Sequence, residues 1–328
     1  MAGLLAPQFQ DEDKAREHLE SILWKDGPVC PKCGEIDTLG VTELAKLPGF
    51  KSHGRTGLHQ CKGCRSQFTV TVGTIFEDSH IPLNKWLLAI HLMCSSKKGI
   101  SALQLQRNLW GEDEITKKPK GSYRTAWFLC HRVRWAMTQS PMVEKLSGVV
   151  EADETYIGGR EIGQGHQGRN VSKKTPVLAL VERGGDVRSF PIKRATLKNI
   201  KPIIMQHVDP STHLVTDEYP VYYQMRNEFA AHSEIKHKDK KYVRKDGDFT
   251  VTTNTVESFF ALLKRSNYGI HHHMSRKYLG SYCAERDFVY NARKVSDDER
   301  TQKAIKATKG KRLMLKQPKN TEGPEDDD

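Results

Sequence analysis

The chain has 328 residues, and its 52 Lys and Arg outnumber its 40 Asp and Glu, which gives a formal net charge of +12 at pH 7. Such a length is enough for about two or three domains with buried cores. The positive charge favours a nucleic-acid partner, because each Lys or Arg set against a phosphate releases counterions; a basic protein without such a partner is the alternative. No segment approaches the roughly 18–20 apolar residues of a membrane span, and the first residues lack the basic start of a signal peptide. We therefore expect a cytoplasmic protein without a membrane partner.

The first 80 residues contain a predicted helix over 11–25 and then two CxxC pairs. The pairs are formed by Cys30, Cys33, Cys61 and Cys64. In each pair the two-residue gap lets a tight turn direct both sulfur atoms at one metal, and Gly34 and Gly63 would ease the two turns. Thiolates at this spacing are typical of a tetrahedral Zn²⁺ site with sulfur–zinc distances of about 2.3 Å. The pattern predicts a zinc ribbon, but leaves open whether the ribbon binds DNA, RNA or protein, or only stabilises a small domain.

Residues 81–146 form a region of predicted amphipathic helices, over 83–95, 101–109 and 122–138. The second and third helices resemble a helix-turn-helix, although the connection from Trp110 to Gly121 is longer than usual. The third helix is expected to present a set of basic side chains to DNA, and a solvated surface is the alternative. That set is Arg124, His131, Arg132 and Arg134.

From residue 147 the pattern changes to the alternation of β-strands, which predicts an α/β domain with a mixed sheet over 147–295. The order is a strand in "VVEADETYIGG", a hairpin in "PVLALVERGGDVRSFPI", a helix, two more strands and a final helix. Beyond it, the segment 301–320 carries basic residues and no acidic one, and the chain closes on "EGPEDDD". We expect residues 296–328 to be a disordered basic tail with an acidic end.

Three carboxylates stand at element ends in the 147–295 domain. Asp153 ends the first strand, Asp217 ends the fourth, and Glu257 opens the last helix. In a mixed sheet of this order the ends of strands one and four are neighbours, and a helix packed behind them can add the third carboxylate. Clustered carboxylates repel one another unless a cation joins them, and oxygen ligands suit Mg²⁺ or Mn²⁺. The pattern favours a two-metal site acting on a phosphodiester, against structural acids in an unrelated α/β domain.

Several motifs together resemble the IS1595-type (ISXO2-like) DDE transposases of bacterial insertion sequences. They are "VEADETYIGG", "TDEYPVYY", "NTVESFFALLKRSNYGIHHHMSRKYLGSYCAERDFVYNAR" and the ribbon that continues into "QFTVTVGTIFEDSHIPLNKWLLAIHLM". The resemblance covers roughly residues 15–295. It implies a ribonuclease H-like catalytic core preceded by the zinc ribbon and the helical, helix-turn-helix-like domain. Matched residue by residue, it implies Asp153, Asp217 and Glu257 as the catalytic, metal-binding acids.

The resemblance also assigns auxiliary and DNA-binding positions. Lys264, seven residues after Glu257 and on the same helix face, occupies the position of a lysine that contacts DNA near the cut. Asn254 stands three residues before Glu257 and could assist as a neutral ligand. The predicted DNA-binding set is Arg124, Arg132, Arg134, Lys264, Arg265, His271 and His272.

The hypothesis is a nucleoid-associated DNA transposase that uses Mg²⁺ or Mn²⁺ to cleave and transfer strands at the terminal inverted repeats of an insertion sequence. Its partner would be double-stranded DNA, bound by a homodimer or a higher oligomer, with Zn²⁺ in the ribbon. One alternative is a DNA-binding regulator derived from an inactive transposase. Another is a stand-alone nuclease of the same fold, which would cleave without joining.

Overall fold

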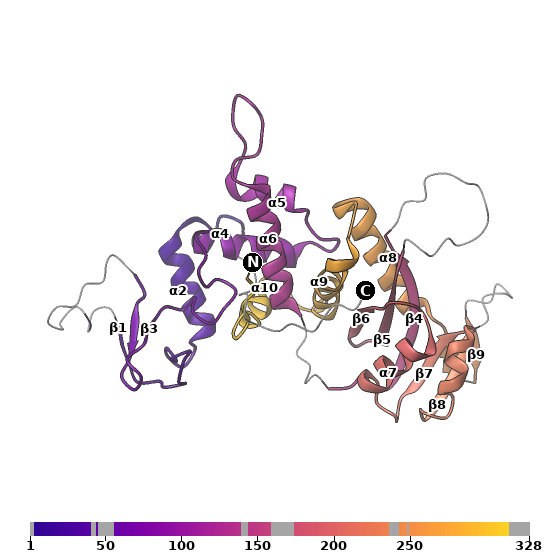
Figure 1. Ribbon diagram of the computed structural model, residues 1–328. Coiled ribbons are helices and arrows are strands. Elements are labelled where there is room, and N and C mark those ends of the chain that lie inside the picture. Colours follow the sequence, from indigo (N-terminus) through magenta and orange to yellow (C-terminus); the bar gives the residue numbers. More distant parts are fainter. Residues whose placement is uncertain are drawn as a thin grey trace. The chain divides into compact units, whose positions relative to one another are not determined.

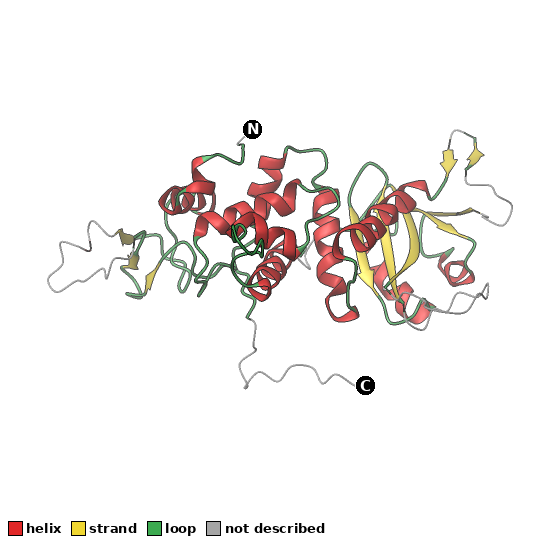
Figure 2. Ribbon diagram, turned by 90° about the horizontal axis from the view of Figure 1, so that it is seen from above, coloured by secondary structure: helices red, strands yellow, loops and turns green. Residues whose placement is uncertain are grey.

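The computed structural model describes residues 3–40, 44, 56–138, 144–158, 174–235, 243–247 and 249–314 (Figures 1 and 2). The chain divides into two compact units. One comprises residues 1–92, 102–136 and 301–328, and the other comprises residues 93–101 and 137–300. Among the described residues, no helix is long and apolar enough to cross a membrane.

The first unit begins with two helices and a small sheet. Helix α1 spans Pro7–Gln10 and α2 spans Glu12–Leu23. The Asp11 side chain accepts a hydrogen bond from the Lys14 amide, which satisfies a free donor of the first turn of α2. The sheet is antiparallel in the order β1–β2–β3, with strands Thr38–Gly40, His59–Cys61 and Gln67–Phe68.

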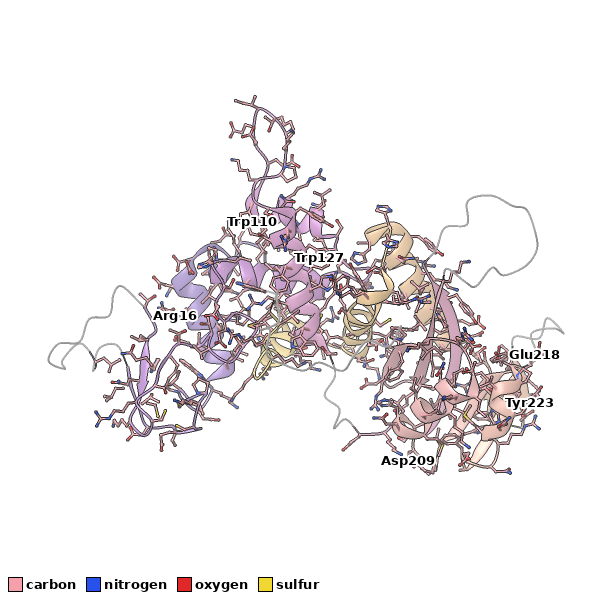
Figure 3. All side chains as sticks on the ribbon, viewed as in Figure 1. Arg16, Trp110, Trp127, Asp209, Glu218 and Tyr223 are labelled. Atoms are coloured by element: carbon pink, nitrogen blue, oxygen red, sulfur yellow. The ribbon has the colours of Figure 1, made fainter. Side chains whose placement is uncertain are left out.

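Three helices follow close to the predicted bounds: α4 (Leu83–Ser95), α5 (Ala102–Trp110) and α6 (Tyr123–Met137). The connection between α5 and α6 is held by Gln106, whose Nε2 donates to the carbonyls of Lys120 and Gly121. Gly121 has a φ of +74° and lies against the ring of Trp110 (labelled in Figure 3), where an added Cβ would come within 3.0 Å of the ring. A glycine is therefore needed where the chain turns back into α6.

The prediction of disorder from residue 296 onward is wrong for part of that segment. Residues Asp297–Lys306 form helix α10. A buried stripe at the i, i+3, i+4 and i+7 spacing follows from Thr301 and continues just past the helix end: Thr301, Ala304, Ile305 and Thr308. Its two lysines, Lys303 and Lys306, are exposed, whereas Arg300 is buried and donates to the carbonyls of Ala292 and Cys94. Residues 315–328 lie outside the described part of the chain.

The second unit is built on a five-stranded mixed sheet in the order β6–β5–β4–β7–β8. Strand β4 (Val149–Ile157) runs antiparallel to β5 (Thr175–Glu182), which forms a hairpin with β6 (Val187–Pro191). On its other side β4 runs parallel to β7 (His213–Asp217), and β7 runs parallel to β8 (Ala231–Ile235). The expected α/β class with a mixed sheet is confirmed.

Helices cover both faces of this sheet. One face packs with α7 (Leu197–His207) and the 3₁₀ helix η2 (Pro220–Met225), through a core that includes Val150, Ala152, Leu180, Ile204 and Tyr222. The other face receives α8 (Asn254–Ser266), which buries Val256, Phe259 and Phe260 against Ala179 and Val181, and α9 (Leu279–Asn291). A two-stranded ribbon of β9 (Arg244–Asp246) and β10 (Phe249–Val251) leads into α8.

Candidate active site

The parallel pairing of β4 and β7 brings two of the predicted acids together. Ala152 pairs with Thr216, so Asp153 and Asp217 follow the last paired residues of these neighbouring strands. Asp217 ends β7, but the expectation that Asp153 ends the first strand is wrong, because β4 continues along β5 to Ile157. Paired residues of adjacent strands point to the same face, which here is the face covered by α8. Asp217 Oδ1 also accepts a hydrogen bond of 3.0 Å from the Tyr219 amide, which shapes the turn from β7 into η2. The sheet therefore presents both aspartates side by side on this face.

Helix α8 carries the third acid across this face. Glu257 lies in its first turn and is exposed, and its Oε1 accepts a hydrogen bond of 3.0 Å from the hydroxyl of Thr253. Asn254, the first residue of the helix, is exposed as well. Glu257 is close enough to Asp153 to influence its ionisation, as described next.

The electrostatics of the site formed by the three acids centre on Asp153. Burial raises its pKa to about 8, and the charges of Asp217, Glu154 and Glu257 add to the rise, while a hydrogen bond from the Glu154 amide opposes it. A carboxyl with such a pKa keeps its proton at neutral pH unless a cation compensates the neighbouring negative charges. The three acids together therefore form a site whose negative charges are not compensated.

Glu154 belongs to the other face of the sheet. Its Oε2 accepts a hydrogen bond of 2.7 Å from the hydroxyl of Tyr222, a residue of η2 that is buried in the core. Burial, and then the nearby charge of Glu154, raises the pKa of Tyr222 well above its usual value, so the phenol stays neutral and donates. Strand alternation thus directs Glu154 away from Asp153.

The residues that could hold metal fall into two sets. Among the described residues, the group whose ligand atoms all lie within 4.8 Å of one another consists of Cys30, Cys33, Cys61 and Cys64. The three carboxylates do not form a group that close. Their oxygen donors nonetheless suit Mg²⁺ or Mn²⁺, and the raised pKa of Asp153 shows that the site would gain from a bound cation.

The cysteine cluster is built from two matching turns. Cys30 N–H donates to the carbonyl of Glu35, and Cys61 N–H donates to that of Ser66, five residues ahead in each case. The residue four places after the first cysteine has a positive φ in both turns: Gly34 at +78° and Arg65 at +57°. The expected role of Gly34 is therefore confirmed, whereas Arg65, and not Gly63, takes the left-handed position in the second turn.

The sulfur spacing fits a tetrahedral zinc ion. The Sγ atoms of Cys30 and Cys64 are 3.7 Å apart, and those of Cys33 and Cys61 are 3.5 Å apart. Sulfur–zinc bonds of about 2.3 Å at tetrahedral angles require about 3.8 Å between sulfurs. Hydrogen bonds from the side chain and backbone of Ser66 lower the pKa of Cys64 to about 6, whereas the pKa of Cys33 in the same cluster is raised to about 12. Cys64 therefore favours the thiolate that zinc binds, and zinc binding would have to release a proton from Cys33.

Comparison with known proteins identifies the family of both domains. Residues 145–291 match the model of the ISXO2-like transposase domain, and residues 10–67 match the model of the transposase zinc-ribbon domain. A relative described as "Uncharacterized protein in transposable element ISH50", from Halobacterium salinarum, is 29% identical over 272 residues, which make up 78% of this chain and 83% of that protein. The chain belongs to the ISXO2-like transposase family.

A solved structure also matches this family member, but only weakly. A chain of the simian T-cell lymphotropic virus intasome in complex with PP2A regulatory subunit B56 gamma has 14% identity and a TM-score of 0.27. The match covers 57% of this chain and 60% of that one, which is less than two thirds of its length. A TM-score this low supports no argument about the transposase.

Two of the predicted DNA-binding arginines on α6 are buried, which contradicts the expectation that the helix presents them. Arg132 and Arg134 are 7% and 2% exposed, whereas Arg124 is exposed. Arg132 Nη2 donates to the carbonyl of Glu77 at 2.7 Å, and its guanidinium lies 5.3 Å from the ring centre of Trp86. The charge is therefore engaged in packing the first unit of the transposase. His131 is also buried.

The predicted cations after Glu257 remain accessible. Lys264 and Arg265 are exposed on α8, and so is His272 beyond the helix. The chain leaves α8 through a π-helical turn, Asn267–His271, and His272 then adopts a left-handed φ of 58°. His271 is half-buried, with its ring centre 4.8 Å from that of Tyr282.

Sequence reasoning missed two residues that support the site of the three acids, Glu151 and Arg183. Glu151 lies two positions before Asp153 on the same face of β4 and is fully buried. Its Oε1 accepts a hydrogen bond of 2.7 Å from Nε of Arg183, which follows β5. The available signal was a glutamate pointing into the covered face of a buried strand, where an unpaired charge is costly.

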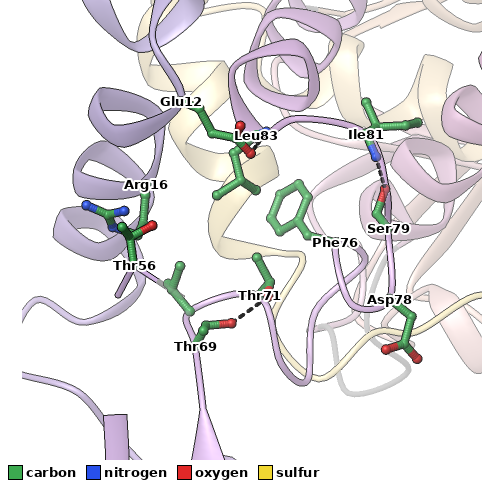
Figure 4. A pocket seen from close by; sticks show the side chains of 11 residues that line it. Glu12, Arg16, Thr56, Thr69, Thr71, Phe76, Asp78, Ser79, Ile81 and Leu83 are labelled. Carbon is green, nitrogen blue, oxygen red and sulfur yellow. Dashed lines mark hydrogen bonds between the residues drawn. The ribbon is translucent and has the colours of Figure 1, made fainter. Parts of the chain in front are cut away.

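A separate cavity of about 240 Å³ lies in the first unit (Figure 4). Its lining includes Arg16, Thr69, Phe76, Asp78 and Ser79. Arg16 is already paired with Asp13 and Glu20 on its own helix. The cavity gives no indication of a catalytic role.

Proposed function

We propose that this protein is a DNA transposase whose catalytic acids are Asp153, Asp217 and Glu257. The observation that carries the proposal is the parallel pairing of β4 and β7, which places Asp153 and Asp217 side by side where this pairing ends, on the face that α8 covers with Glu257. The raised pKa of Asp153 supports it, because the carboxyl is under the influence of both other acids. Membership of the ISXO2-like family supports DNA cleavage and transfer as the overall reaction.

The same three acids are proposed to hold Mg²⁺ or Mn²⁺. When bound, divalent ions at such a site increase the nucleophilicity of a water or 3′-hydroxyl oxygen and stabilise the leaving oxygen. Asp153 would bind as a carboxylate after losing the proton that its surroundings otherwise favour. We assign Glu257 as the third ligand because a carboxylate binds these ions better than an amide, and Asn254 would assist as a neutral ligand.

In the proposed reaction, water attacks phosphorus at the element end and the 3′-oxygen leaves. That 3′-hydroxyl then attacks a target phosphodiester, so that one phosphorus–oxygen bond forms for each one broken. We further propose a ribonuclease H-like core, a description supported by the hairpin of β5 and β6 beside β4 and the parallel order β4–β7–β8. The zinc ribbon at 1–80, the helical domain at 81–146 and the catalytic domain at 147–295 remain our proposed division.

DNA would be bound by exposed cations. Lys264 follows Glu257 by about two helical turns on the same face of α8, beside Arg265, and Arg124 is exposed on α6. We propose that His271 and His272 line the path of the scissile strand. The burial of Arg132 and Arg134 removes them from this set. Two element ends must be held together during transfer, so a homodimer or higher oligomer on DNA is part of the proposal.

The test is a cleavage assay with purified protein, Mg²⁺ or Mn²⁺, and a labelled duplex that carries the terminal repeats flanking the gene. Nicking at the repeat end and joining to a target, both lost in Asp153→Ala, would support the proposal. Binding of the duplex without nicking under any divalent ion would overturn it in favour of a DNA-binding regulator. Nicking without joining would indicate a nuclease.

A further inference from the structure

A buried carboxylate connects the strand of Asp153 to the helix of Glu257. Glu151 in β4 is fully buried. Its Oε2 accepts hydrogen bonds from the amides of Thr255 at 2.8 Å and Val256 at 3.0 Å. Its Oε1 accepts one from the Thr255 hydroxyl at 2.9 Å. The carboxylate thus binds the N-terminal turn of α8, where the free amides and the helix dipole favour a negative charge.

Arg183 fixes Glu151 and the chain that enters α8. Its Nε donates to Glu151 Oε1 at 2.7 Å. Its Nη1 and Nη2 donate to the carbonyls of Thr250 and Thr252, each at 2.7 Å. One guanidinium therefore joins the buried carboxylate to the last strand before the helix. Because its donors form a rigid planar fork, these contacts define orientation as well as distance.

The ends of this connection lie beside two of the proposed catalytic acids. On β4, Glu151 is two residues before Asp153 and points to the same face. On α8, the residues bound by Glu151 immediately precede Glu257 in the first turn. Any shift of the helix start along the strand would therefore change the separation between the Asp153 and Glu257 carboxylates.

We propose that Glu151, held by Arg183, is a positioning residue that sets the separation of Asp153 and Glu257 for shared divalent ions. This inference rests on the proposed function. A purely structural role would stabilise α8 against the sheet without affecting metal affinity. The two roles differ in what they predict for variants that lose one buried hydrogen bond and keep the fold.

The chain offers a matched control for such a loss. Ser189 in β6 donates its hydroxyl to Asp287 Oδ1 at 2.7 Å, a buried bond between the sheet and α9. Thr255→Val removes a hydroxyl bond to Glu151 and preserves the side-chain shape, whereas Ser189→Ala removes a similar bond at the edge strand. Thr255→Ser retains the hydroxyl and should rescue the effect.

The experiment measures Mn²⁺ binding to the zinc-loaded, full-length protein from the electron paramagnetic resonance signal of free Mn²⁺. Asp153→Ala should abolish the tightest site. Glu151→Gln should weaken it about tenfold, as is typical when groups that orient ligands are lost, and Thr255→Val about threefold. Thr255→Ser and Ser189→Ala should bind like the wild type, even if Ser189→Ala lowers the thermal midpoint as much as Thr255→Val.

Each outcome decides a different point. If Asp153→Ala leaves Mn²⁺ binding unchanged, the proposed metal site is wrong and the positioning role falls with it. If Asp153→Ala abolishes binding but Thr255→Val behaves like Ser189→Ala, the metal site stands and the positioning role is overturned. Thr255→Val keeps the test decisive even if Glu151→Gln does not fold.

Discussion

The cysteine cluster of the zinc ribbon and the proposed metal site of Asp153, Asp217 and Glu257 are organised in opposite ways. The four sulfur atoms lie within 4.8 Å of one another and come from two similar turns. The three acids come from β4, β7 and α8 and repel one another enough to contribute to a pKa of about 8 at Asp153. A closed ligand set serves to hold a fold, whereas an open and charged one sacrifices stability and stays available to a substrate.

Loss of zinc should have the largest effect on stability, because the four cysteines would no longer be joined through a metal. Structural zinc sites contribute roughly 10–16 kcal/mol of apparent binding free energy, and small ribbons unfold without metal. Cys61→Ser should abolish zinc binding and make residues 10–67 susceptible to proteases, while the sheet of the second unit keeps its protection. Zinc content by mass spectrometry and limited proteolysis measure this. Full zinc occupancy in the variant would refute the ligand assignment.

Loss of an acid from the open set should affect activity and not the fold. Asp153→Asn or Asp217→Asn should reduce cleavage of terminal-repeat DNA about 10³-fold, equivalent to ~4 kcal/mol of transition-state stabilisation. DNA binding without metal should stay within about twofold of the wild type, because neither substitution removes a positive charge. Single-turnover cleavage of a labelled duplex measures the first value. A variant that cleaves at the wild-type rate would exclude that residue from the metal site.

The contrast between the two sites also explains what could be predicted from sequence. The ribbon is local, so the spacing of Cys30 and Cys33 is enough to indicate it. The pairing of Asp153 with Asp217 follows from strand order, and the structure has the two strands parallel and adjacent. The link from Glu151 to Thr255 joins residues 104 positions apart. No periodicity reports such a contact.

The errors in the helical region have a related cause. The charge of Arg132 predicts a solvent-exposed side chain, yet it packs on Trp86, an aromatic residue from another helix. The basic composition of residues 301–320 predicts a disordered tail, although the buried stripe of α10 includes Ala304 and Ile305. In both cases, tertiary contacts supplied an environment that composition does not describe.

Without a divalent ion at the three acids, the stability of the protein should depend on pH through Asp153. The pKa of Asp153 is about 8 in the fold, against a reference value of 3.8. Between these values the folded protein keeps a proton that the unfolded chain has released, so stability falls as pH rises through this window. Asp153→Asn removes this loss and should be more stable than the wild type by roughly 1–3 kcal/mol at pH 8, with little difference near pH 4.

Calorimetric melting points of the zinc-loaded protein, dialysed free of Mg²⁺ and Mn²⁺, measure this difference. Asp287 also has a pKa raised to about 8 by burial, but it contributes equally to both proteins and cancels. Adding Mg²⁺ should raise the melting point of the wild type and leave Asp153→Asn unchanged. If the melting points of the two proteins changed in parallel across the pH range, the ionisation of Asp153 would not reduce the stability of the fold.

The smallest expected effect is on DNA binding, and it distinguishes an exposed cation on α6 from a buried one. Arg124 is exposed on α6, whereas Arg132 on the same helix donates to the Glu77 carbonyl and packs on Trp86. Arg124→Ala should weaken DNA binding about fivefold, or ~1 kcal/mol, and reduce the salt dependence by about one counterion, with an unchanged melting point. Arg132→Ala should instead lower the melting point, because the Glu77 carbonyl and the Trp86 ring lose their partner. Equal losses of DNA affinity in the two variants, at a temperature where both are folded, would mean that the burial of Arg132 does not keep it from DNA.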